Sequence, residues 1–173
     1  MKSLALLLVG GWLAGSLIMF FVATQNFRTV DRLLASPTTQ AAPALAALPH
    51  DNMRMLLRHL SSELNRLYFF TWDLVQIAVG LAVVALLVLL RRKAETILAG
   101  IMLSIVAIQL LFITPRITAI GRALDFVPRN PLPPSAAPMM AEFWRLHGAF
   151  TGSDLVIAAL GLVLAWKLRD SVI

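Results

Sequence analysis

The stretch that decides the fold is Tyr68–Leu90, which reads YFFTWDLVQIAVGLAVVALLVLL. Its 23 residues contain one charged side chain, Asp73, and are long enough for a helix to cross the roughly 30 Å hydrocarbon core of a bilayer. Only helices and closed barrels satisfy their backbone in lipid, and the alternation of a barrel strand is missing here. The stretch therefore predicts a transmembrane helix.

Three further apolar stretches have the same character. We expect spans at residues 4–24, 96–114 and 148–166, in addition to 68–90. The 173 residues are 59% hydrophobic and 14% charged, which is more apolar surface than a soluble domain of this length buries. The sequence predicts one integral membrane domain over residues 1–173, an all-α bundle of four transmembrane helices.

The connections between the spans are very unequal. Residues 91–95 join the second and third spans, whereas more than 40 and more than 30 residues separate the other pairs. The two long connections must lie on one side of the membrane and the chain termini on the other. We expect an amphipathic helix at about 51–67, with Met53, Leu56 and Leu60 on its apolar face, and flexible linkers at about 36–48 and 128–138.

The net charge of +6 fits an anionic lipid surface better than nucleic acid, because the basic residues form no stripe with interleaved aromatics. Basic residues are densest beside the spans on the terminal side. This density favours a bacterial inner membrane with both termini in the cytoplasm, while the raw count of basic residues favours the reverse. The six on the terminal side are Lys2, Arg91, Arg92, Lys93, Lys167 and Arg169.

Polar residues inside the spans gather toward the end that faces the long connections. A charged carboxylate at membrane depth is costly unless it is paired, hydrated or neutralised, and Arg116 is the expected partner of Asp73 or Asp154. We expect either a polar pocket for a small ligand, ion or proton, or a hydrogen-bonded clasp between helices. The candidate residues are Asp73, Gln76, Gln109, Arg116, His147, Thr151 and Asp154.

A metal site is a second hypothesis. Imidazole and thioether groups on the long-connection side suit a soft ion such as Cu(I), and two histidines could also hold a haem. Methionines serve more often in packing, so we expect no cofactor, with copper as the alternative. The candidate metal ligands are His59, His147, Met53 and Met139.

Enzyme signatures are missing from the sequence. There is no phosphate-binding loop, nucleophile elbow or zinc-protease helix, and the absence of Cys excludes thiolate chemistry. We expect a non-enzymatic protein. The alternative to a ligand-binding protein is an accessory or structural subunit that docks another membrane protein, or a second copy, through small-residue faces such as Gly11 with Gly15.

Three segments resemble the transmembrane protein 205-like family. They are Gly-Gly-x-x-x-Gly at 10–15 with Asn26-Phe27-Arg28 after it, Pro115-Arg116-Ile117, and Phe143-Trp144-Arg145-Leu146-His147-Gly148 followed by Leu160-Gly161-Leu162. The resemblance implies a small integral membrane protein of about four spans and gives His147 added weight, but it supplies no established reaction. The chain departs from the family in having Thr151 and Asp154 where Ser and Asn are usual, and in a longer stretch at 36–52.

Overall fold

A computed structural model describes residues 1–36, 42–43, 49–128 and 131–170 of the chain. Across these residues the structure is helical and contains no strand. The main helices are α1 (Lys2–Ala35), α3 (His50–Leu89), α4 (Lys93–Ile108), α5 (Thr114–Leu124) and α6 (Ala137–Asp170), with a π-helical turn η1 (Gln109–Ile113) and a 3-10 turn η2 (Pro134–Ala136). Since η1 makes α4 and α5 continuous, the described residues contain four helical stretches long and apolar enough to span a membrane, as the sequence predicts.

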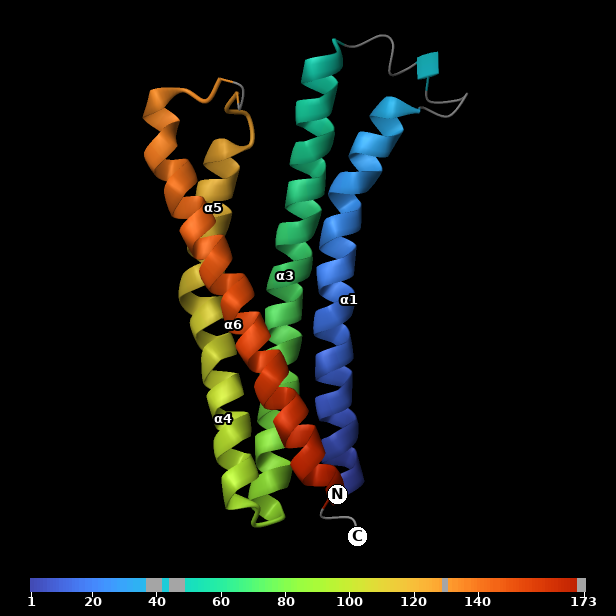
Figure 1. The fold of residues 1–173 in the computed structure, drawn as a ribbon, viewed down its shortest axis with the longest axis vertical. Helices are drawn as coiled ribbons and strands as arrows, with labels where there is room; N and C mark the ends of the chain where they lie inside the picture. The colour runs from blue at the N-terminus through green and yellow to red at the C-terminus, as the bar shows by residue number, and fades with distance from the viewer. Residues whose placement is uncertain (37–41, 44–48, 129–130, 171–173) are drawn as a thin grey trace.

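The helices form an elongated up-and-down bundle (Figure 1). Helix α1 packs against α3 and α6, and α4 packs against α3 and α6. The start of α1, the end of α6 and the turn between α3 and α4 lie at one end. This turn is tight because Arg91 adopts a left-handed φ of 55° and reverses the chain within three residues. At the opposite end, the α5–α6 pair diverges from the α1–α3 pair (Figure 1).

The helices extend beyond the predicted spans. Helix α3 is continuous over 40 residues, so the predicted amphipathic helix at 51–67 runs directly into the span at 68–90. The linker predicted at 128–138 is shorter than expected, because η2 and the start of α6 occupy residues 134–138. Its residues 129–130, and most of the linker predicted at 36–48, lie outside the described residues.

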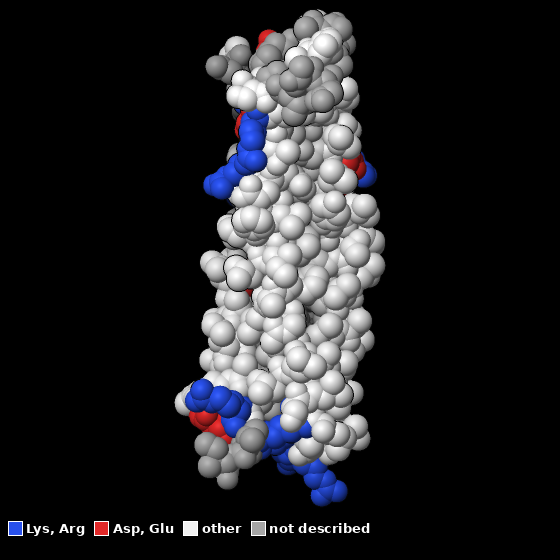
Figure 2. Space-filling model, turned by 90° about the vertical axis from the view of Figure 1, so that its right-hand side faces the viewer, with Lys and Arg blue, Asp and Glu red and all other residues white. Residues whose placement is uncertain are grey.

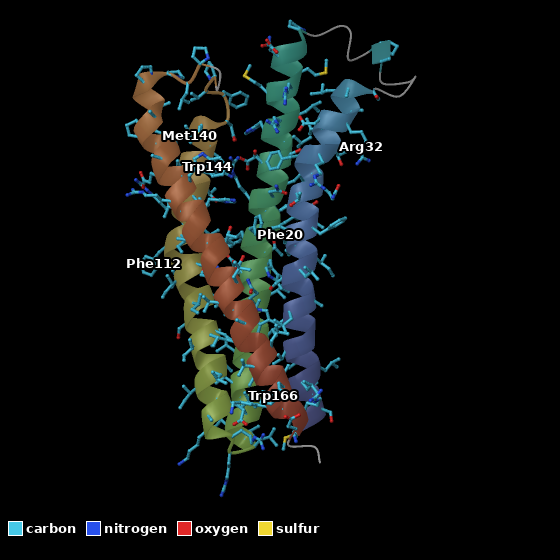
Figure 3. The ribbon with its side chains drawn as sticks, viewed as in Figure 1. Phe20, Arg32, Phe112, Met140, Trp144 and Trp166 are labelled. Atoms are coloured by element: carbon cyan, nitrogen blue, oxygen red, sulfur yellow. The ribbon has the colours of Figure 1, made fainter. Side chains whose placement is uncertain are left out.

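On the face shown in Figure 2, an apolar belt separates two charged ends of the bundle. Large side chains such as Phe20 and Phe112 are exposed on this belt. Two exposed tryptophans of α6, Trp144 and Trp166, lie toward its two ends (Figure 3). They are 22 residues apart, which corresponds to about 33 Å along a helix and matches the roughly 30 Å of a hydrocarbon core bounded by interfacial tryptophans.

The apolar core fills the half of the bundle near the termini. Trp12 of α1 is buried there with Val83 and Leu87 of α3, Met102 of α4 and Leu164 of α6. A Cβ atom at Gly80 would lie 2.9 Å from a methyl group of Leu103 and 3.1 Å from the Trp12 ring, so the absence of a side chain lets these groups pack closely.

The outer half of α3 has its polar face inward. Ser61 and Asn65 are buried against α1, where Asn65 accepts a hydrogen bond of 2.6 Å from Asn26 and donates one of 3.1 Å to the carbonyl of Ala23. Leu56 and Leu60, on the predicted apolar face, are exposed, although Met53 is buried. Hydrogen bonds rather than apolar burial therefore hold α1 to α3 here, and most of the apolar face of this helix points outward.

Candidate functional site

Asp73 of α3 is the most deeply placed carboxylate among the described residues. Its side chain is fully buried, and its Oδ2 accepts a hydrogen bond of 2.8 Å from the hydroxyl of Thr114. Its Oδ1 is buried and has no partner among the described residues. Asp73 therefore has one acceptor oxygen left for a proton or a cation.

Gln109 joins the same region to α6. Its amide nitrogen donates 2.8 Å hydrogen bonds to Oδ1 of Asp154 and to the hydroxyl of Ser153. Its Oε1 atom is buried and, within the described part of the chain, has no partner. Asp154 and Asp73 thus bind side chains at the two ends of the same helical turn, Gln109 and Thr114. We call the five residues Asp73, Gln109, Thr114, Ser153 and Asp154 the acidic site.

The π-helical turn η1 brings two of these residues together. Residues five apart point about 140° away from each other on a regular α-helix. In η1 the backbone N–H of Thr114 bonds to the carbonyl of Gln109, and both side chains are buried. Pro115, which follows, cannot donate to the carbonyl of Leu111, so a widened turn is favoured at this point. Pro115 is the sequence signal that could have indicated it.

The acidic site lies near the midpoint between the two tryptophans of α6. Asp154 is 10 residues from Trp144 and 12 from Trp166, or about 15 and 18 Å along the helix. The acidic site therefore lies nearer the middle of the bundle than the sequence suggests, since the sequence predicts polar residues toward the end that faces the long connections. Within the described residues, neither Asp73 nor Asp154 forms an ion pair. Asp73 is bound by the hydroxyl of Thr114, and Asp154 is bound by the amide of Gln109.

Several predicted members of the site lie elsewhere. Arg116 does not pair with Asp73 or Asp154; it is exposed and binds Glu142 of α6, with Nε and Nη2 each 2.8 Å from Oε1. The pairing is possible because Arg116 follows Thr114 by two residues and so points away from the bundle interior. Gln76 is buried, but its amide oxygen accepts a 2.7 Å hydrogen bond from the indole of Trp12.

The predicted polar face of α6 is also different from the observed one. His147 and Thr151 are exposed, and His147 contacts the rings of Phe143 and Trp144 on its own helix. The buried stripe of α6 includes Phe150 and Ile157, and Ser153 and Asp154 lie between them at helical spacing. Ser153 was not among the predicted site residues, because its apparent direction on an ideal helix separates it from His147.

A second polar cluster joins α3 to the end of α5. Arg66 donates 2.8 Å hydrogen bonds to both carboxylate oxygens of Asp125 and one of 2.6 Å to Glu63. Arg122 donates bonds of 2.8 and 2.9 Å to Glu63, and His59 lies 2.7 Å from Asp125. We call these five residues the ion-pair cluster. It bridges the two helix pairs where they diverge.

Arginines dominate the electrostatics of the ion-pair cluster. Glu63 lies outside the apolar span at 68–90, and the hydrogen bond from Arg122 lowers the pKa of Glu63 from 4.5 to about 2, with a further contribution from Arg66. Two guanidinium groups thus balance two carboxylates. The cluster is a structural bridge that needs no additional cation.

The predicted metal ligands are divided between two helices: Met53 and His59 lie on α3, and Met139 and His147 lie on α6. Among the described residues, one group of His and acidic side chains could hold a metal ion, because its ligand atoms lie within 4.8 Å of one another. This group consists of His59, Glu63 and Asp125, and His147 is not part of it. Arg66 and Arg122 already neutralise both carboxylates of this group. Met53 is buried near the start of α3, and Met139 is exposed at the start of α6.

Comparisons of the chain with protein-family models, with curated proteins and with solved structures return no match.

Proposed function

We propose that this chain is an integral membrane protein that binds a small cation, a proton or an alkali metal ion, at the acidic site in the middle of its bundle. The observation that carries this proposal is the pair of buried, unpartnered acceptor oxygens, Oδ1 of Asp73 and Oε1 of Gln109. A buried acceptor without a donor is costly, and ionisable groups at membrane depth commonly mark ion or proton sites.

The chemistry of the donors selects the type of cation. The site offers carboxylate, amide and hydroxyl oxygens, from Asp73, Asp154, Gln109, Ser153 and Thr114. Oxygen ligands suit a proton or a hard cation and are poor ligands for Cu(I). Binding of copper would instead require the histidines and methionines of the outer end. We propose that the protein has no cofactor, and copper is the alternative.

Infrared difference spectroscopy on the protein in lipid nanodiscs tests the proposal. We expect a protonated carboxyl band that decreases when the pH is raised, or when Na⁺ replaces a large organic cation at constant pH. These two arms distinguish a proton site from an alkali metal site. Asp73→Asn and Asp154→Asn should each abolish the response, because an amide cannot exchange a proton or carry the negative charge.

The control is Asp31→Asn, since Asp31 is an exposed carboxylate of α1 that pairs with Arg54 and Arg58. It should leave the spectrum of the site unchanged. A structural clasp predicts the opposite pattern: no response to pH or Na⁺ in the unmodified protein, and loss of thermal stability in Asp73→Asn. The titration of the unmodified protein alone distinguishes a cation site from a structural clasp, so the test still works if a variant fails to fold.

The proposed location is a bacterial inner membrane with both termini in the cytoplasm. Its support is the density of basic residues beside the helix ends near the termini, including Arg91, Arg92 and Lys167. The resemblance to the transmembrane protein 205-like family belongs to the same proposal and adds no reaction to it.

An accessory subunit is the second candidate function. Gly148 and Gly152 of α6 are four residues apart, and a Cβ atom at either position would meet nothing within 4 Å, so this small-residue face is not used inside the bundle. If the face docks a partner, gentle solubilisation should recover a stoichiometric companion or a second copy, and Gly152→Leu should release it. If both the unmodified protein and the Gly152→Leu variant are recovered without a companion, docking through this face is contradicted.

A further inference from the structure

A groove of about 570 Å³ lies between α3 and α5 on the outside of the bundle. Leu60, Leu67 and Phe70 of α3 form one wall, and Pro115 and Thr118 of α5 contribute to the other. Since α3 and α5 run in opposite directions, the end of the groove near Leu60 also contains Glu63 and Arg122, and the end near Phe70 contains Thr114. From Leu60 to Phe70 its length is about 15 Å.

The groove changes from polar to apolar along this length. Its inner part lies beside residues 67–72, where α3 has no charged side chain, and its outer end reaches the ion-pair cluster. Leu60, Leu67 and Phe70 are all exposed, so the groove opens to the surroundings of the apolar belt rather than to the interior. An occupant that matches this pattern has an apolar chain with a polar group at one end.

Arg122 has hydrogen-bonding capacity left for such a polar group. Its Nε and Nη2 atoms bind Glu63, while its Nη1 atom has no partner among the described residues. Its side chain is 60% exposed, whereas that of Arg66 is 13% exposed and uses both terminal nitrogens on Asp125 and Glu63. A guanidinium group is well suited to donate to a phosphate oxygen.

We propose that the groove is a phospholipid site, in which one acyl chain lies along Leu67 and Phe70 and the phosphate accepts a hydrogen bond from Nη1 of Arg122. Because Leu67 and Phe70 are exposed on the outside of the bundle, the acyl chain can enter the groove sideways from the surrounding bilayer. The phosphate lies beside Arg122, at the level of Glu63 of α3. A phosphodiester is thus held at one end and its hydrocarbon tail along the wall.

Native mass spectrometry of the delipidated protein, titrated with a phosphatidylglycerol, tests this site. We expect one lipid to remain bound at low lipid-to-protein ratios. Arg122→Ala should reduce the retained fraction at least fivefold. The matched control is Arg116→Ala, because Arg116 is equally exposed at 61% and also pairs with a glutamate, yet does not line the groove. It should retain the lipid as the unmodified protein does.

A second variant separates the acyl chain from the phosphate. Leu67→Trp fills the groove without altering the charged end and should also remove the bound lipid. Three results would overturn the proposal: no retained lipid in the unmodified protein, equal loss in Arg116→Ala, or full retention in Leu67→Trp. If inorganic phosphate or glycerophosphate displaces the lipid at equal concentration, the site recognises a free anion and the acyl-chain assignment fails.

Discussion

Replacing Arg66 by methionine should destabilise the folded protein by about 3 to 5 kcal/mol, the usual cost of breaking a buried ion pair from one side. Arg66 is 13% exposed, and its partner Asp125 is 5% exposed. The substitution keeps an unbranched apolar side chain but removes both hydrogen bonds of the guanidinium group to Asp125, which keeps its contact with His59. Thermal or denaturant unfolding in a mild detergent measures the effect.

The control for this change is Arg116→Met, whose exposed pair with Glu142 should contribute little to stability because solvent screens it. The double variant Arg66→Met with Asp125→Asn should regain part of the lost stability, since it removes the uncompensated charge as well. Equal unfolding midpoints for Arg66→Met and Arg116→Met would show that the ion-pair cluster does not hold α3 to α5.

Gly15→Ala should destabilise the bundle by about 1 to 3 kcal/mol, the range typical of overpacking. A Cβ atom at Gly15 of α1 would overlap the ring of Trp72 in α3, so the ring must move or the helices must separate. The small residue accommodates an aromatic side chain here. The same unfolding assay applies, with the near-ultraviolet circular dichroism of the tryptophans as a second measurement of ring packing.

Gly11→Ala is the matched control, because Gly11 lies one turn away on the same helix and a Cβ atom there would meet nothing within 4 Å. It should be neutral or slightly stabilising, since alanine has the higher helix propensity. If the two variants unfold alike, helix propensity rather than contact with Trp72 governs both positions. This comparison also tests the sequence prediction that the Gly11 and Gly15 pair forms one packing face, which the structure supports only at Gly15.

The acidic site shows how far a sequence pattern reaches in a membrane protein. Asp73, Gln109 and Asp154 could be selected because a polar residue within an apolar stretch is unusual whatever its partners are. Arg116 was assigned to the same group by its level along the chain, and the structure pairs it with Glu142 instead. The sequence gives the depth of a residue along its span. The direction in which its side chain points around the helix also depends on the local helical twist, which η1 changes between Gln109 and Thr114.

The outer half of α3, whose polar face packs against α1, shows a similar limit of the sequence pattern. Leu56, Leu60 and Ser61 show a clear amphipathic pattern, but a periodicity does not say which face packs against protein. In water the apolar face would turn inward. Beside lipid there is no such preference, and the hydrogen bonds of Asn65 with Asn26 and with the carbonyl of Ala23 favour the reverse.

The sequence by itself determined that this protein has four long apolar helices, that its termini share one end of the bundle, and that carboxylates lie within two of its spans. These properties follow from hydropathy and from the lengths of the connections, which are local quantities. Only the tertiary structure decided that Thr114 binds Asp73 while Gln109 binds Asp154, that Arg66 joins Asp125, and that Arg122 borders a groove. Such contacts join residues more than 40 positions apart, and they depend on the rotation of each helix about its axis, which the mean hydropathy of a span does not specify.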